Sequence, residues 1–139
     1  MEYTESVESL WENRMQVVPH FKRTRMARFF PEFEAVIRNV HRGVVYGPRR
    51  AAQTPYFDYL RGYYDRWMAP LNRRSRRQIW ERFKDGIDLY HSIKADGIRD
   101  PLVMRQYRNG LCIYMGTRRL VIAHVLGIPT VRCIIWEAP

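Results

Sequence analysis

The sequence predicts an α+β fold, in which a helical N-terminal extension packs on a small mixed β-sheet. Apolar residues recur every three or four positions over 73–95, which indicates an amphipathic helix. Asn109-Gly110 separates two strand-like runs and is the strongest short-range signal for a β-hairpin. A second apolar helix then precedes a last strand-like run, Val131–Trp136. With 139 residues the chain can bury roughly two-thirds of its unfolded surface, so its core needs neither a metal nor a disulfide.

The first 70 residues predict helices of irregular spacing. Glu5–Met15 is a short helix, and a second helix opens or bends at Pro31. Gly47-Pro48 predicts a turn before a helix over Ala51–Ala69, which a proline and a glycine interrupt. Aromatic residues are dense in this last helix, as is more typical of a core or an interface than of a base-stacking platform. We therefore expect residues 1–72 to pack over the sheet, with a homodimer contact as the open alternative.

The C-terminal unit, residues 73–139, begins with the long helix, which ends at Gly97. The two hairpin strands follow, and apolar residues alternate in the second, Leu111–Met115, as in a half-buried strand. The helix over 118–126 is apolar nearly all round, so we expect it to be packed on most sides. A Gly-Ile-Pro sequence ends it before the closing strand. The order helix, hairpin, helix, strand predicts a small mixed sheet.

Cys112 and Cys133 lie in strand-like segments between apolar residues, which indicates buried free thiols. Neither the cysteines nor the four histidines have metal-ligand spacing, so we expect no metal site. His124 lies in the apolar helix and is expected to be a hydrogen-bonded core residue. The sequence contains no signal peptide and no long apolar run, and we expect a cytoplasmic protein without a membrane contact.

The net charge of +10 is unevenly distributed. Residues 1–40 hold six basic and six acidic residues, whereas residues 41–82 hold ten basic and three acidic ones. Such a basic segment suits a polyanion such as nucleic acid, with a solvated arginine-rich surface as the alternative. The residues expected to contact nucleic acid are those at the start of the long helix, Arg73, Arg74, Arg76 and Arg77.

Gly116-Thr117-Arg118-Arg119 is the most informative motif, because it joins a strand-like run to a helix. The Thr117 hydroxyl is available to cap that helix. Arginines in a first turn are unfavourable by a few tenths of a kcal/mol each, because a helix N-terminus already carries about half a positive charge. An anion in front of the helix reverses this cost, since Gly116 lets it approach the backbone and the guanidinium groups close around it. The motif predicts a phosphate site.

Several separated pieces of sequence share the spacing of a known family. They are Ser92-Ile93-Lys94, Gly97-Ile98, Pro101-Leu102-Val103, Gly116-Thr117-Arg118-Arg119-Leu120, Ala123 and Leu126-Gly127-Ile128-Pro129-Thr130-Val131. Over about 84–137 the chain resembles the ParB/sulfiredoxin-like domain. In that family the Gly-x-(Arg/His)-Arg box and the loop before the Pro-Leu-x-Val strand surround nucleotide phosphates. The resemblance thus implies a nucleotide ligand, CTP or ATP, with Mg²⁺ left open, and a site formed by Arg99, Asp100, Gly116, Thr117, Arg118 and Arg119.

The chain departs from this family at the positions that carry its chemistry. Sulfiredoxins have a catalytic cysteine where this chain has Thr117, and ParB proteins and the related free-serine kinases have a glutamate there. A threonine cannot act as a base near neutral pH, although its hydroxyl can bind phosphate or Mg²⁺. Asp100 is then the better-placed acid for a catalytic role, with turn structure as the alternative. ParB proteins also continue into a helix-turn-helix domain, and since this sequence stops at Pro139 we expect no DNA recognition through that module.

Three functions therefore stay open at this point. The first is a module that binds a phosphate-bearing ligand, above all a nucleotide. The second is a nucleic-acid-binding protein that uses the basic segment 41–82. The third is a small-molecule phosphotransferase or nucleotide hydrolase, so the sequence does not decide whether the chain is an enzyme.

Overall fold

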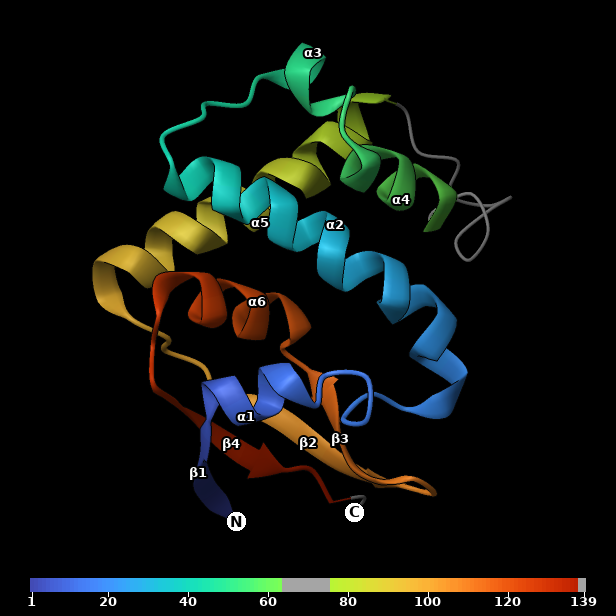
Figure 1. The fold of residues 1–139 in the computed structure, drawn as a ribbon, viewed down its shortest axis with the longest axis vertical. Coiled ribbons are helices and arrows are strands. Elements are labelled where there is room, and N and C mark those ends of the chain that lie inside the picture. The colour runs from blue at the N-terminus through green and yellow to red at the C-terminus, as the bar shows by residue number, and fades with distance from the viewer. Residues whose placement is uncertain (64–75, 138–139) are drawn as a thin grey trace.

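The computed structural model describes residues 1–63 and 76–137 and has an α+β fold, as predicted (Figure 1). Its elements are, in chain order, β1 (Glu2–Ser6), α1 (Val7–Glu12), the 3-10 helix η1 (His20–Lys22), α2 (Arg23–His41), α3 (Pro48–Ala51), α4 (Pro55–Tyr63), α5 (Arg76–Asp96), β2 (Leu102–Tyr107), β3 (Gly110–Met115), α6 (Thr117–Leu126) and β4 (Thr130–Ile135). The expected hairpin, the following helix and the closing strand are all present.

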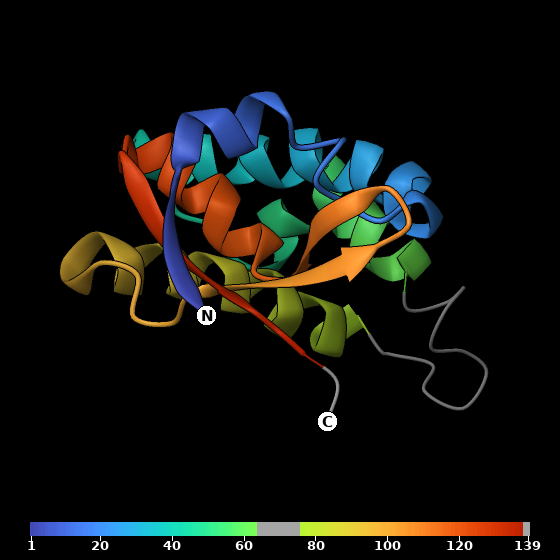
Figure 2. The same cartoon turned by 90° about the horizontal axis from the view of Figure 1, so that it is seen from below.

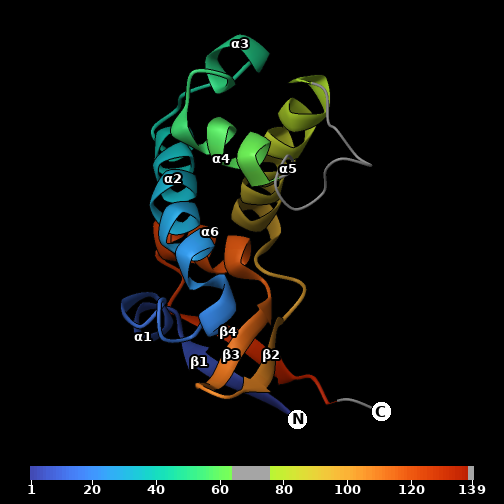
Figure 3. The ribbon, with the colours of Figure 1, turned by 90° about the vertical axis from the view of Figure 1, so that its right-hand side faces the viewer.

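The four strands form one mixed sheet in the order β1-β4-β2-β3. The pairs β1–β4 and β2–β3 are antiparallel, whereas β2 and β4 are parallel. Leu102 and Tyr3 both pair with Cys133, one from each side of β4. The first strand of the chain thus lies beside the last one, so N-terminal residues complete the sheet as well as covering it (Figure 3).

The expected helix over Glu5–Met15 was wrong at both ends, since the observed helix begins at Val7 and ends at Glu12. Residues up to Ser6 are a strand, because β4 offers them an edge to pair with, and that partner is more than 120 residues away in the sequence. The Ser6 Oγ accepts a hydrogen bond from the Ser9 N–H at 3.2 Å, so Ser6 caps the helix that begins at Val7.

The second helix runs through Pro31 instead of starting there. A proline inside a helix removes one backbone hydrogen bond and crowds the preceding turn, at a cost of about 3 kcal/mol. Burial of an apolar face along all of α2 offsets this cost. The buried residues of that face are Met26, Phe29, Phe30, Phe33, Val36, Ile37 and Val40.

The expected helix over Ala51–Ala69 is two helices within the described residues. α3 ends at Ala51, and α4 begins at Pro55 after a turn in which the Thr54 Oγ accepts a hydrogen bond from the Phe57 N–H at 3.2 Å. Residues 64–69 of that expected helix lie outside the described part of the chain.

Helix α6 lies between the sheet and a layer formed by α2 and α5 (Figures 1 and 2). Its buried residues are Leu120, Val121, Ile122, Ala123 and Val125, which point in several directions around the helix. This confirms the expectation that α6 is packed on most sides. Because α6 is held in this way, the chain segment that enters it is fixed relative to α2 and α5.

The expected alternation in β3 was wrong. Cys112 and Ile113 are both buried, while Met115 is exposed. The β2–β3 register shifts near Val103, and the segment before η1 covers the outer edge of β3, where the Ile113 N–H donates to the Val17 carbonyl at 2.8 Å. Both cysteines are buried free thiols, as predicted. Within the described residues, no helix is both long and apolar enough to cross a membrane.

A candidate anion-binding pocket

The start of α6 is shaped by a glycine in a left-handed conformation. Gly116 has φ 120° and ψ 15° and is the N-cap residue, whose carbonyl accepts the first helical hydrogen bond from the Leu120 N–H at 3.0 Å. Thr117 is therefore the first helical residue, and the expectation that its hydroxyl caps the helix was wrong. A Cβ on Gly116 would lie 2.5 Å from the Leu102 Cδ2, so this position requires glycine both for conformation and for space.

A cavity of about 300 Å³ lies at this helix start. Four parts of the fold form its walls: α2 contributes Arg25, Met26 and Phe29; α4 contributes Tyr56, Tyr59 and Leu60; α5 contributes Arg82 and Leu89; the β3–α6 corner contributes Met115, Gly116, Thr117, Arg118 and Arg119. The first-turn N–H groups of a helix have no acceptors within it, and together with the helix dipole they favour an anion.

Four half-buried arginines from three helices line this cavity, namely Arg25, Arg82, Arg118 and Arg119. Among the described residues of its wall there is no aspartate or glutamate. Four like charges around one cavity repel one another. An anion placed between them would attract each of the four guanidinium groups and so offset that repulsion. The structure thus brings Gly116, Thr117, Arg118 and Arg119 together, as predicted, and adds two arginines to them.

Sequence reasoning missed Arg25 and Arg82. Each lies on a helix of which one face is buried and the other carries several arginines, so nothing local sets these two apart. Only the packing of α2 and α5 on either side of α6 shows that they face the same space as the predicted motif.

Arg119 has a second task besides lining the cavity. Its Nη1 donates to the carbonyl of Asp100 at 2.9 Å and to that of Pro101 at 2.6 Å, which ties the loop before β2 to the first turn of α6. Burial lowers the pKa of the Arg119 guanidinium, and the nearby negative charge of Asp100 opposes that shift. Arg119 therefore holds the site in shape through the backbone of the facing loop.

Arg99 and Asp100 do not line the arginine-rich cavity. They lie at a smaller cavity of about 100 Å³, whose wall also includes Arg119. The Arg99 Nη2 donates to the Asp96 Oδ2 at 2.9 Å, and both of these side chains are more than half exposed. Asp100 thus lines a different cavity from Thr117, although Leu89 and Arg119 line both, and its backbone carbonyl accepts a hydrogen bond from Arg119.

The arginines expected to contact nucleic acid are only partly described. Arg73 and Arg74 lie outside the described residues. Arg76 and Arg77 are exposed at the start of α5 and line an open groove together with Arg49 and Trp80. The Arg77 Nε lies 3.5 Å from the Glu81 Oε1, so this arginine has an acidic neighbour on its own helix. This groove is distinct from the cavity at α6.

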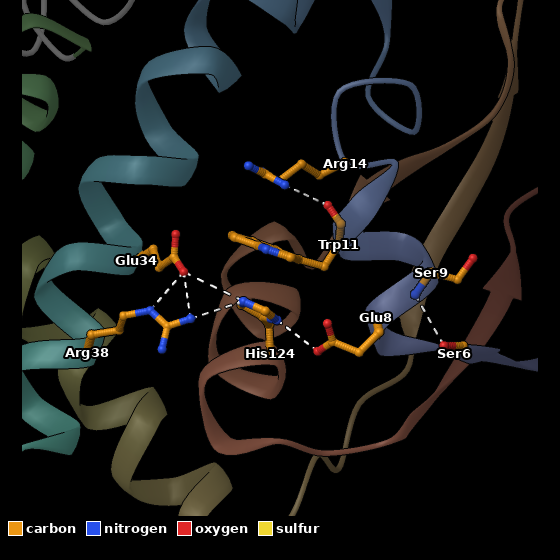
Figure 4. A network of polar contacts seen from close by, with 8 residues as sticks. All are labelled: Ser6, Glu8, Ser9, Trp11, Arg14, Glu34, Arg38 and His124. Atoms are coloured by element: carbon orange, nitrogen blue, oxygen red, sulfur yellow. Dashed lines mark hydrogen bonds and ion pairs between the residues drawn. The ribbon is translucent and has the colours of Figure 1, made fainter.

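His124 belongs to a polar network that joins α1, α2 and α6 (Figure 4). Its Nδ1 lies 2.9 Å from the Glu8 Oε1, and its Nε2 lies 3.1 Å from the Arg38 Nη2. Arg38 in turn donates from Nε to the Glu34 Oε2 at 2.9 Å. His124 is thus hydrogen-bonded and largely buried, as predicted, with 14 % of its side chain exposed. The described residues contain no group of three His, Cys, Asp or Glu that could hold a metal ion.

No family model matches the chain, and neither a curated protein nor a solved structure matches it. The resemblance to the ParB/sulfiredoxin-like domain, and the nucleotide ligand that it implies, therefore stay predictions.

Proposed function

We propose that this protein binds a phosphate-bearing small molecule, with a nucleotide as the leading candidate, in the cavity at the start of α6. One observation carries the proposal: Arg25, Arg82 and Arg118 converge from three helices on a space that opens onto a helix N-terminus. Guanidinium groups and first-turn N–H groups are the donors that proteins use for phosphate oxygens.

The remaining walls suit the uncharged part of such a ligand. Phe29, Tyr56 and Tyr59 lie on the α2 and α4 side of the cavity, and the rings of Tyr56 and Tyr59 are stacked with centroids 6.0 Å apart. Small-molecule sites combine an apolar or aromatic wall with a few polar groups, and have volumes from about 300 to 1,000 Å³. A nucleotide would fit these two walls if its base lay beside the aromatic rings and its phosphates lay toward the start of α6.

The resemblance to the ParB/sulfiredoxin-like domain supports the same assignment, since that family binds nucleotide phosphates at the equivalent of Gly116-Thr117-Arg118-Arg119. Binding is better supported than phosphoryl transfer, because Asp100 lies at a different cavity. Among the described lining residues, Thr117 has an oxygen suited to Mg²⁺ but no carboxylate accompanies it. If Mg²⁺ takes part, the phosphates of the ligand would therefore supply most of its oxygen ligands.

A thermal-shift comparison of nucleotides with their nucleosides, with and without Mg²⁺, tests the proposal. CTP or ATP is expected to raise the melting temperature of the protein, whereas the nucleosides are not, since a ligand that binds only the folded state stabilises it. Arg82→Gln and Arg118→Gln are expected to abolish the shift. Arg42→Gln removes the same charge from an exposed position at the end of α2 and serves as the matched control.

Equal shifts in all three variants would contradict the pocket assignment, as would the absence of a shift with any phosphate compound. Release of inorganic phosphate that requires Mg²⁺ and is lost in Asp100→Asn would show that the protein is a phosphotransferase or hydrolase instead.

A further inference from the structure

An aromatic cluster lies on the face of the sheet that the long helices leave uncovered. Leu102 and Met104 of β2 are buried beneath the helices, so Val103, Arg105 and Tyr107, which alternate with them, belong to the opposite face. The long helices α2, α5 and α6 are on the other side of the sheet (Figures 1 and 2). On the open face Cys112, which is paired with Arg105, is buried, whereas Tyr114 and Trp136 are exposed and available to a partner.

Three rings surround the guanidinium of Arg105 on this face. Its Cζ lies 4.5 Å from the ring centroid of Trp136, 5.6 Å from that of Tyr114 and 5.7 Å from that of Tyr107. Tyr114 and Trp136 are stacked, with centroids 5.8 Å apart and an interplanar angle of 27°. We call Tyr107, Tyr114 and Trp136 the aromatic platform. Trp136 is 38 % exposed and Tyr114 is 37 % exposed, so the platform presents ring surface to solvent.

The charged groups that contact the platform and its extension are cations: Arg105 lies beside the three rings, and Lys22 lies beside Phe21. Farther along the same face, Arg132 is paired with Glu2, at 3.0 Å from Nη1 to Oε1. Among the described residues, no carboxylate forms an ion pair with Arg105, whose guanidinium lies beside the aromatic rings. The platform continues toward Phe21, which is 74 % exposed, lies 6.1 Å from Tyr107 and has Lys22 beside it.

We propose that the aromatic platform binds single-stranded nucleic acid, with bases stacked on Trp136 and Tyr114 and the phosphate backbone beside Arg105. Exposed rings accept any unpaired base, and interleaved cations hold the backbone, which is the combination used by sequence-tolerant single-strand sites. A double helix keeps its base faces covered and would leave the rings unused. A second copy of this chain is disfavoured as the occupant, because each copy carries a net charge of +10.

Fluorescence anisotropy with a labelled oligothymidylate of about twelve nucleotides tests the proposal. Trp136→Leu and Tyr114→Leu remove the rings but keep apolar side chains, and each is expected to weaken binding by about 5- to 150-fold, the loss of one stacked base. Trp136→Phe keeps a ring and is expected to restore most of the affinity. Arg105→Gln is expected to lower the affinity more than Arg42→Gln, which removes the same charge elsewhere.

An oligomer of the same length made only of abasic sugar-phosphate separates stacking from charge. Binding of this oligomer as tightly as oligothymidylate would overturn the proposal, and so would wild-type affinity in both leucine variants. Sedimentation of wild-type protein and Trp136→Leu provides a third criterion: a dimer that dissociates on this substitution would show that a second copy occupies the face. Circular dichroism of each variant verifies that it is folded. The thermal shift with nucleotides reports on the α6 cavity separately.

Discussion

The imidazole of His124 lies against the indole of Trp11, with ring centroids 4.2 Å apart and an interplanar angle of 14°. The guanidinium of Arg14 lies 4.3 Å from the indole centroid, and its Nη1 donates to the Trp11 carbonyl at 2.8 Å. Because His124 also contacts Glu8 and Arg38, this stack fixes α1 and α2 onto α6 (Figure 4). The polar contacts of one histidine thus help to hold the layer that carries the α6 cavity.

Trp11→Ala is expected to lower the free energy of unfolding by about 3–5 kcal/mol, because it removes a buried ring and leaves a cavity under α1. Urea denaturation measures this loss. Arg14→Ala removes only the outer contact of the stack and should cost about 0.5–1 kcal/mol. Similar costs for the two variants would show that the indole does not anchor α1.

Gly116→Ala is expected to destabilise the protein more than Gly127→Ala does. Both glycines have a left-handed backbone, and this conformation alone costs an alanine about 1–2 kcal/mol. A Cβ at Gly127 meets open space, whereas one at Gly116 would lie 2.5 Å from the Leu102 Cδ2. Chemical denaturation of the two variants compares the costs, and equal values would contradict the close approach of α6 to β2.

Arg119→Met is expected to lower the free energy of unfolding by about 1.5–3 kcal/mol, since hydrogen bonds from a charged donor to the carbonyls of Asp100 and Pro101 are lost. Asp100→Asn keeps the carbonyl that accepts one of these bonds and should change stability by no more than about 0.5 kcal/mol. Thermal denaturation of both variants shows whether Arg119 stabilises the protein through the backbone carbonyls or through an ion pair with the Asp100 carboxylate. A large loss in Asp100→Asn would favour the carboxylate.

Stability is expected to fall as the pH rises from about 9 to 11. Burial raises the pKa of the Cys133 thiol from 9.0 to about 11 and that of Tyr3, its neighbour across the β1–β4 pair, from 10.0 to about 12. Both groups hold their protons more tightly in the folded state, so the unfolded state ionises first and is favoured as the pH increases. Melting temperatures across this range measure the effect. Cys133→Val should lessen the decline between pH 9 and 11, and an unchanged decline would assign it to other groups.

The elements that depend on local signals could be predicted from the sequence. Asn109-Gly110 correctly indicated the hairpin, although its turn residues are Arg108 and Asn109, and Gly110 already pairs with Tyr107 as the first residue of β3. Gly127 ends α6 with a left-handed backbone and with the Ile128 N–H donating to the Ala123 carbonyl at 2.9 Å. Strand β1 could not be predicted, because residues 2–6 are extended only through their pairing with β4. The course of α2 through Pro31 likewise depends on the apolar layer that covers it.

The candidate site divides in the same way. Gly116 and the arginines that follow it could be found from the sequence, because positively charged side chains in the first turn of a helix are unfavourable beside the positive end of its dipole. Arg25 and Arg82 become neighbours of that turn through helix packing, and Asp100 is directed elsewhere by the course of its loop. Adjacency between helices carries no local signature.

The pairing of β1 with β4 has a consequence for biosynthesis. Residues 2–6 leave the ribosome more than 120 residues before their partners at 130–134. A nascent chain can form helices and the β2–β3 hairpin while it grows, but its sheet closes only after β4 has been synthesised. Contacts of such long sequence separation slow folding. Until β4 pairs with it, the edge of β2 stays unpaired, and chaperones would recognise this edge.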